Sequence, residues 1–132
     1  MKLTRASSYA LHAVVYMARK KGTALVAAET IAKDQSIPEK FLPRLLKPLV
    51  SAQILLSRKG PGGGYRLARP ASLISMLEII EAVDGPIQGL VPMNNGKAAA
   101  RLDSRLQAIC DQSAGQVRKL LGAIRISELT RR

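Results

Sequence analysis

Apolar residues recur at intervals of three and four along the first fifty positions and again along the last third of the chain, with an alternating segment between them. The first spacing is typical of amphipathic helices, and the alternation is typical of β-strands. The pattern predicts a first helix that is capped by Thr4 and runs to about Lys20. A short helix over 28–34 and a third helix starting near Pro38 follow, with a brief turn between them. Two helices connected in this way form a helix-turn-helix.

The third predicted helix has an apolar side and a basic side. Its apolar side chains are Phe41, Leu42, Leu45, Leu46, Leu49 and Val50. Lys40, Arg44 and Lys47 are spaced i, i+4, i+7 and share the opposite side. A helix that enters the major groove of DNA needs this arrangement, although an ordinary solvated face also accounts for a basic stripe. Pro43 and Pro48 predict a bend or a shortened helix, because proline lacks an amide donor and crowds the carbonyl four residues back.

Residues 54–70, with the sequence ILLSRKGPGGGYRLARP, predict a β-hairpin directly after the helix pair. Two short β-prone segments flank a glycine-rich turn, and basic residues lie along both of them. Glycines allow a backbone to approach phosphates closely, although they also close ordinary surface hairpins. A hairpin at this place makes the wing of a winged helix-turn-helix. The candidate DNA contacts in it are Arg58, Lys59, Gly62, Gly63, Tyr65 and Arg66, with Arg69 in support.

The rest of the chain predicts two more helices separated by a loop. Ser75 and Glu78 have the spacing of a capping box, and the apolar helix that they begin is stopped by Gly85. Residues 86–97 show no helical period and predict a loop, and a long helix runs from about Ala98 to Gly122. Its apolar positions are Leu102, Leu106, Ile109, Val117, Leu120, Leu121 and Ile124. A stripe of this length must be buried, either against its own domain or against the same helix of a second subunit.

These elements predict a mainly α-helical fold with a small β-hairpin. Residues 1–85 make a winged helix-turn-helix DNA-binding domain with its wing at 54–70, residues 86–97 a loop, and residues 98–132 a dimerisation helix with a C-terminal tail.

The distribution of charge supports a polyanionic partner for the front half. The chain has 21 basic and 9 acidic side chains, a net charge of +12. Residues 1–69 hold 13 basic and 3 acidic side chains, a net of +10, whereas residues 70–132 hold 8 and 6, a net of +2. With no Trp, one Phe and three Tyr, stacking platforms for single-stranded nucleic acid are not expected, which favours double-stranded DNA. The sequence shows no signal-peptide pattern, no apolar run of membrane-spanning length and a single cysteine, so a cytoplasmic protein is expected.

The order of elements resembles the Rrf-type (IscR/NsrR/CymR-like) winged helix-turn-helix transcriptional regulators. The matching segments are Met-Lys-Leu-Thr at the start with Tyr9-Ala10, Glu29-Thr30-Ile31-Ala32, Phe41-Leu42, the wing sequence from Lys59 to Leu67, the segment from Ile79 to Pro86, and Ile126-Ser127-Glu128-Leu129. The resemblance covers nearly the whole chain, and the wing sequence is its most specific part. It implies a homodimeric bacterial transcription factor, usually a repressor, that binds a palindromic operator.

The iron–sulfur members of that family hold their cluster with three cysteines around the start of the long helix. Here residues 86–105 contain no cysteine and no histidine, and Asp103 is their one acidic residue. Such clusters need thiolates or comparably strong donors, so we expect no cluster, no metal and no cofactor. The single cysteine, Cys110, falls on the long helix. Both a small apolar role and a redox-active thiol remain open for it.

Enzymatic functions are not expected. His12 is the only histidine, lies on the solvated side of the first helix and is far along the chain from Cys110. The glycines at 60–64 lack the Lys-Ser/Thr ending of a phosphate-binding loop. Two alternatives to a simple DNA-binding regulator remain: a module whose basic half docks an acidic partner protein, and a regulator gated by Cys110 oxidation or by a small molecule. That molecule would bind between the 75–84 helix, whose acids at 78, 81 and 84 are interpreted as a solvated edge, and the long helix.

Overall fold

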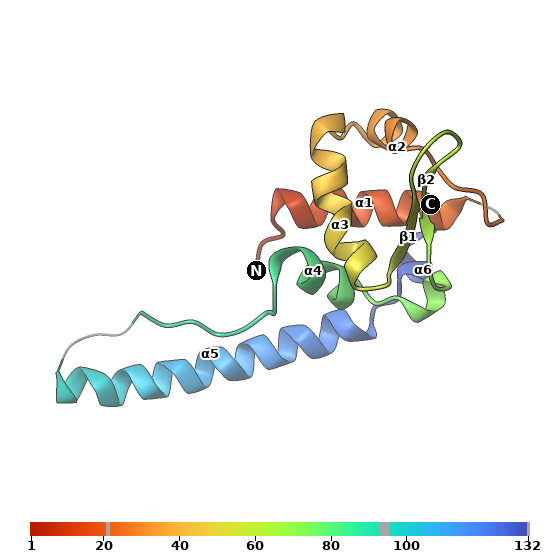
Figure 1. The fold of residues 1–132 in the computed structure, drawn as a ribbon. Helices are drawn as coiled ribbons and strands as arrows, with labels where there is room; N and C mark the ends of the chain where they lie inside the picture. The colour runs from red at the N-terminus through yellow and green to blue at the C-terminus, as the bar shows by residue number, and fades with distance from the viewer. Residues whose placement is uncertain (21, 93–95, 132) are drawn as a thin grey trace.

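The structure is a computed structural model that describes residues 1–20, 22–92 and 96–131 (Figure 1). Its elements are α1 (Arg5–Arg19), α2 (Ala28–Gln35), the 3-10 turn η1 (Glu39–Phe41), α3 (Leu42–Ser51), β1 (Leu55–Arg58), β2 (Gly64–Leu67), the 3-10 turn η2 (Ala71–Leu73), α4 (Met76–Asp84), α5 (Lys97–Ala123) and α6 (Ile126–Leu129). The mainly helical fold with one hairpin and a long C-terminal helix is confirmed. Part of the predicted 86–97 loop, residues 93–95, and the last residue of the tail lie outside the described residues.

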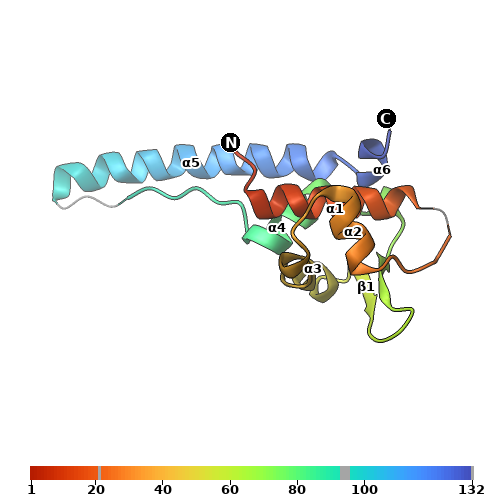
Figure 2. The same cartoon turned by 90° about the horizontal axis from the view of Figure 1, so that it is seen from above.

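The helix α1 is the centre of the compact domain. Thr4 caps it by accepting a hydrogen bond from the Ser7 amide, as the sequence predicts. Val14 and Met17 are among the buried residues of its apolar side, whereas His12 is exposed on the opposite side. In Figure 2 α1 and α4 lie in the middle of the molecule, with α5 on one side and α3 with the hairpin on the other.

The helix-turn-helix forms as predicted, but its second helix begins later than Pro38. Ser36, in the left-handed region with φ 54°, ends α2 and donates its amide hydrogen bond back to Ala32. Residues 39–41 form a single 3-10 turn, and α3 starts at Leu42. Pro43 therefore stands in the first turn of α3, where a missing amide costs no hydrogen bond. Only Pro48 lies inside the helix, which continues past it to Ser51.

This later start changes two predictions about the side chains before α3. Lys40 lies on the 3-10 turn rather than on the helix that carries Arg44 and Lys47. Phe41 was predicted to fill the core but is 47% exposed, because the 3-10 turn has three residues per turn and rotates it away from Leu42 and Leu45, which are buried.

The hairpin pairs β1 with β2 in antiparallel register, with Leu55 opposite Leu67 and Arg58 opposite Gly64. A third segment joins it at Val26, whose amide and carbonyl exchange hydrogen bonds of 2.8 and 2.9 Å with the backbone of Tyr65. The wing is thereby attached to the segment just before α2. Nothing in the hydropathy pattern around Val26 had indicated this contact.

The helix α5 leaves the compact domain as a long arm (Figure 1). Its 27 residues, at 1.5 Å each, extend about 40 Å. Within the described residues, no helix has the length and apolarity needed to cross a membrane. The loop after α4 runs beside α5: Gln107 Nε2 donates a 2.6 Å hydrogen bond to the Gly89 carbonyl, and a Cβ on Gly89 would lie 2.4 Å from the Cys110 carbonyl carbon. The loop thus lies directly on the backbone of the arm.

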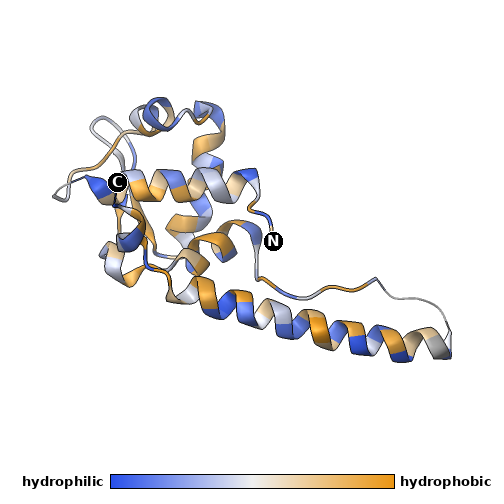
Figure 3. Cartoon of the chain, turned by 180° about the vertical axis from the view of Figure 1, so that it is seen from behind, coloured by the Kyte–Doolittle hydropathy of each residue, from blue (hydrophilic) through white to orange (hydrophobic). Residues whose placement is uncertain are grey.

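Figure 3 shows hydrophobic and hydrophilic residues following one another along α5. Six of the seven apolar residues predicted as one stripe belong to two parallel rows of this helix, and Ile124 follows its end. An inner row, buried or half-buried against the same chain, consists of Asp103, Gln107, Cys110, Ala114, Val117 and Leu121. An outer row, exposed, consists of Leu102, Leu106, Ile109, Ser113, Gln116 and Leu120. Val117 and Leu121, with Ile124 after the helix, pack against the domain core of their own subunit. The four predicted dimerisation residues that remain, in the outer row, are between 39% and 65% exposed.

The acidic residues of α4 are not a solvated edge, because each one binds a different part of the chain. Glu78 completes the capping box with Ser75. Glu81 Oε2 lies 3.0 Å from Arg118 Nε on α5. Asp84 accepts hydrogen bonds of 2.8 and 2.6 Å from the hydroxyls of Thr4 and Ser7 at the start of α1. Their i, i+3, i+6 spacing is typical of a solvated surface, but the three side chains connect α4 to neighbouring parts of the chain.

Candidate nucleic-acid interface

The helix α3 and the wing lie on the side of the domain opposite α5 (Figure 2), and both carry basic residues. We call this surface the basic face and define it by Lys40, Arg44, Lys47, Arg58, Lys59 and Arg66. Five of the six are exposed, and Arg66 is half-buried. Among the described residues none of the six forms an ion pair, since both ion pairs found there involve other basic residues. The positive charge of the basic face is therefore not neutralised by the chain itself.

The residues of the helix and its preceding turn are held by a buried apolar back. Leu42, Leu46 and Leu49 are fully buried and fix α3 against the domain. Arg44 and Lys47 project from the exposed side of this anchored helix, as the sequence predicts. Lys40 lies one turn earlier, with its Nζ 5.2 Å from the centre of the Phe41 ring. Arg44 and Lys47 are thus carried by a regular helix, and Lys40 by the 3-10 turn that precedes it.

The glycines of the wing have internal structural reasons. Gly62 has φ +75°, which L side chains rarely adopt. A Cβ on Gly63 would lie 2.2 Å from the carbonyl oxygen of Arg58, so no other residue fits there without a backbone shift. Gly60, with φ +89°, adds a third position in the tip that favours glycine. The sequence predicted that the glycines let the backbone approach phosphates closely. In the structure, Gly63 allows the two sides of the wing tip to approach each other.

The pairing of the strands decides which wing residues can reach a partner. Directly opposed residues share a face of the hairpin, so Arg58 lies on the face of Arg66 and its partner Leu56, while Tyr65 lies on the other. Tyr65 is half-buried and packs against the domain core. We therefore assign Tyr65 a role in seating the wing. Of the predicted wing contacts, Arg58 and Lys59, both exposed, have the freest access to a partner.

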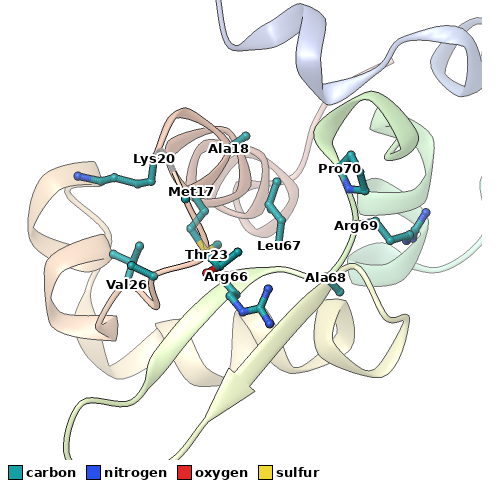
Figure 4. A pocket seen from close by; sticks show the side chains of 12 residues that line it. Met17, Ala18, Lys20, Thr23, Val26, Arg66, Leu67, Ala68, Arg69 and Pro70 are labelled. Atoms are coloured by element: carbon teal, nitrogen blue, oxygen red, sulfur yellow. The ribbon is translucent and has the colours of Figure 1, made fainter.

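A hollow of about 310 Å³ behind the wing also has basic residues around it, but they do not converge (Figure 4). Lys20, at the end of α1, extends to one side, and Arg69 lies on the opposite side beside α4. Arg66 points in a third direction from β2. Because no two of these cations face the same point, the hollow does not form an anion site of its own.

Arg69 connects the base of the wing to α4. Its guanidinium donates to the carbonyl of Leu73 at 2.9 Å and to Glu78 Oε1 at 2.9 Å. Burial opposes ionisation of Glu78, but hydrogen bonds from the Ser75 amide and from Arg69 outweigh it and hold the pKa of this carboxyl below its usual value of 4.5. Arg69, predicted as a supporting DNA contact, is therefore occupied within the protein. Its basic type and position in the wing gave no signal of this role.

Glu81 forms the corresponding connection to the arm. Burial again opposes ionisation, but hydrogen bonds from the Ile87 amide and the Arg118 guanidinium lower the pKa of the Glu81 carboxyl below 4.5. The Ile87 contact, 2.8 Å long, fixes the point at which the loop leaves α4. The helix α4 thus contacts the base of the wing through Glu78 and the arm through Glu81.

A basic helix anchored as the second member of a helix-turn-helix, followed by a basic hairpin on the same side, defines a winged helix-turn-helix DNA-binding protein. A model of the Rrf2 family, described as iron-dependent transcriptional regulators, matches residues 3–132. The chain belongs to the Rrf2 family and is a DNA-binding transcriptional regulator, not an enzyme.

Individual relatives agree with this assignment. The HTH-type transcriptional regulator IscR of Cereibacter sphaeroides is 32% identical over 98% of this chain and 86% of its own length. The regulator CymR of Bacillus subtilis is 29% identical over 76% of this chain and 73% of its own. The solved structure of B. subtilis CymR superposes with a TM-score of 0.78 at 24% identity, covering 98% of this chain and 96% of that one. Oxidised CymR of Staphylococcus aureus superposes with a TM-score of 0.71 at 26% identity, covering 100% and 98%.

The iron dependence in the family's description calls for a set of donor side chains, and this chain's residues do not fit one. The sequence contains one cysteine and one histidine. In the described ranges, no three His, Cys, Asp or Glu side chains come together in a way that would hold a metal. His12 is on α1 and Cys110 is half-buried on the inner row of α5. A cluster ligated by three thiolates does not match these donors.

Proposed function

We propose that this protein binds a specific duplex operator as a homodimer and represses transcription without an iron–sulfur cluster. The observation that carries the proposal is the basic face, in which an anchored helix and a wing present unneutralised cations on one side of the domain. Such a surface suits a polyanion with a groove. The outer row of the arm, on the other side of the domain, supports the dimeric form.

In this proposal α3 enters the major groove. Arg44 reads base edges, because it stands on the first turns of the helix, and an arginine there can bind a guanine through two hydrogen bonds. Lys40 and Lys47, before and after it, bind phosphates. The wing extends along the adjacent backbone, where Arg58 and Lys59 contact phosphates or the minor groove, with Arg66 behind them. The tip glycines, Gly62 and Gly63, contribute by keeping this edge of the wing thin.

The dimer is proposed from the outer row of α5. Leu102, Leu106, Ile109 and Leu120 are exposed on the side of the arm that faces away from its own loop. Leu102, Leu106 and Ile109 are spaced by four and three, which is the spacing that two helices use to pack against each other. The next two positions of the same row hold Ser113 and Gln116, and Leu120 continues it. A twofold axis along this row would place two copies of α3 and two wings on one duplex, and a palindromic operator would match that symmetry.

The test is titration of a duplex from the region upstream of its own gene, measured by fluorescence anisotropy at several salt concentrations. If about six phosphates are engaged, affinity should fall by roughly a thousandfold between 50 and 200 mM salt. A scrambled duplex of the same length and composition is the control and should bind more weakly at every salt concentration. Repression is checked with a reporter placed behind the same upstream region.

Three results would contradict the proposal or part of it. Binding that is independent of salt would show that the basic face is not what holds the DNA. Absence of any duplex binding at low salt, together with an acidic protein that co-purifies with the chain and is released by salt, would assign the basic face to a protein partner. A reporter that falls rather than rises on deletion of the gene would overturn repression while leaving DNA binding intact.

A further inference from the structure

A cavity of about 530 Å³ lies between α1, α3 with the turn before it, and α4. Its size falls within the range of natural small-molecule sites. Tyr9, Leu45 and Val83, from three different helices, form its apolar walls. It does not lie where the sequence suggested an effector, between α4 and α5, because those two helices are in direct contact there: a Cβ on Gly122 would lie 3.5 Å from the Leu77 side chain.

The exposed ring of Phe41 is also part of this cavity. A phenylalanine that is 47% exposed leaves a large apolar surface in water. Its ring lines the opening while the buried Leu45 lies behind it. A ligand with an apolar body would cover Phe41 and remove that surface from water, with the favourable free energy of apolar burial.

Two arginines and no acidic residue are among the residues that line the cavity, so its lining is positively charged. Arg5, from the first turn of α1, and Arg44, from α3, both line it, and both are exposed. No hydrogen bond or ion pair joins either of them to another described residue. The nearby carboxylate of Asp84 is already bound by the hydroxyls of Thr4 and Ser7. A carboxylate on the ligand would supply the anion that both arginines lack.

We propose that this cavity binds an apolar small molecule with one carboxylate, and that the bound ligand competes with DNA for Arg44. The second half rests on the proposed function, because it requires Arg44 to contact DNA. A carboxylate paired with Arg44 would neutralise its charge and hold its side chain over the cavity, away from the groove. The ligand would then act as an inducer that releases the operator.

The test uses 2-naphthoate as the probe and the uncharged 2-naphthylmethanol as its matched control, with affinities measured by calorimetry on the whole protein in the absence of DNA. The acid should bind at least tenfold more tightly than the alcohol, because only the acid pairs with the arginines. Arg5→Gln should remove most of this preference. Arg131→Gln removes one charge at an exposed position far along the chain from the cavity and should leave it unchanged.

Two further measurements fix the location of the site. In amide NMR spectra the shifts caused by 2-naphthoate should gather at Ala6, Leu45 and Val83. Ala6→Leu, which adds three carbons to the wall, should weaken binding at least tenfold while the variant keeps its circular dichroism spectrum. The NMR result stands even if that variant does not fold. Equal binding of acid and alcohol, or shifts that gather elsewhere, would overturn the site.

DNA competition is measured separately. Saturating 2-naphthoate should weaken operator binding at least fivefold, and the alcohol should not. If the protein binds no duplex at all, the proposed function fails while calorimetry still decides whether the cavity is a site. If the acid binds and the operator affinity stays the same, competition is wrong. If Ala6→Leu separates a dimer and leaves 2-naphthoate affinity unchanged, the cavity belongs to an interface between two copies and the proposal is overturned.

Discussion

Arg44 and Lys59 have the same charge, but in the proposed function the backbone that carries each one gives it a different task. Arg44 projects from a helix that is fixed by buried leucines, so its guanidinium can be held at a defined position over a base edge. Lys59 lies at the exposed turn of the wing, where a flexible side chain can follow a phosphate but not select a base. Position on the fold, rather than charge, separates reading from anchoring.

Replacing each of them by alanine should separate the two tasks. Arg44→Ala should reduce discrimination at one base position by about 1–3 kcal/mol, whereas Lys59→Ala should weaken all duplexes alike and lower the salt slope by about 1. Anisotropy titrations against the operator and a set of single-base variants measure both effects. The opposite pattern would show that the wing reads sequence and that α3 only anchors.

The carboxylates of Glu78 and Glu81 should make stability depend on pH. Both have pKa values lowered in the folded chain, so their contribution is present above the unfolded value near 4.5 and is lost as pH falls through the folded value. Urea unfolding at pH 7 and pH 3.5 should show this loss. Glu81→Gln should lower the free energy of unfolding at pH 7 by less than about 1 kcal/mol. It should also reduce the loss of stability between pH 7 and pH 3.5.

The matched control is Glu29→Gln, at an exposed position of α2 that forms no ion pair with the described residues. Glu29→Gln should leave the difference in unfolding free energy between pH 7 and pH 3.5 almost unchanged. An acid response that is the same in Glu81→Gln as in the parent protein would show that the contact with Arg118 does not stabilise the junction of α4 and α5.

At the scale of elements, the pattern of the sequence was sufficient wherever apolar periodicity or a capping side chain decides the structure. It predicted α1, the α4 capping box and the hairpin, because each depends on residues close in the chain. It did not predict the 3-10 turn before α3 or the Val26 bridge to the wing. The 3-10 turn has only three residues, too few for a periodic pattern, and the bridge is a contact between segments almost forty residues apart.

The same limit applies to the candidate site. Arg69 and Tyr65 have the residue types of DNA contacts, but tertiary neighbours occupy the one and half-bury the other. Arg44 and Lys47 were predicted as DNA contacts from their helical spacing, and Arg58 and Lys59 from their place on the wing. All four are exposed, and their contact with DNA stays a prediction.

The wing gives a test of its own geometry. Gly63→Ala would place a Cβ 2.2 Å from the Arg58 carbonyl oxygen, so the tip must shift and Arg58 must move with it. Operator affinity should fall by at least tenfold while the circular dichroism of the helices is retained. Gly115→Ala, in open space on α5, is the control and should instead raise the free energy of unfolding by roughly 0.5–1 kcal/mol. Undiminished operator binding by Gly63→Ala would remove the wing tip from the interface.

At the scale of the whole molecule, α4 stands between the two surfaces that the proposed function uses. Through Glu78 it holds the base of the wing, and through Glu81 it holds the arm. The end of α5 is also joined to the start of α4, since the Met76 amide donates a hydrogen bond of 2.9 Å to the Ile124 carbonyl. In Figure 2, α4 lies between α5 and the side of the domain that carries α3 and the wing.

A charge placed in the outer row should separate the dimer. Ile109 is 58% exposed, so Ile109→Asp should leave the subunit folded while burying a carboxylate in any interface formed there. Sedimentation velocity should show a monomer, and operator affinity should fall with it. Ala108→Asp puts the same group at a neighbouring exposed position outside the row and should stay dimeric. A dimeric Ile109→Asp variant would move the interface to another surface.

The inner and outer rows of α5 differ by one position in the chain, and this restricts how the arm can change during evolution. Val117 and Leu121 hold the end of α5 on the domain, so deleting a single residue between Cys110 and Val117 would rotate the preceding part of the helix by about 100° relative to the domain. Leu106 and Ile109 would then take the inner positions that meet the loop at Gly89. A change of seven residues would keep both rows almost in place. Insertions and deletions that persist in this arm should therefore come in multiples close to seven. A chimaera that carries the arm of a relative should fold and dimerise only when the junction keeps the inner-row and outer-row positions of the two sequences aligned.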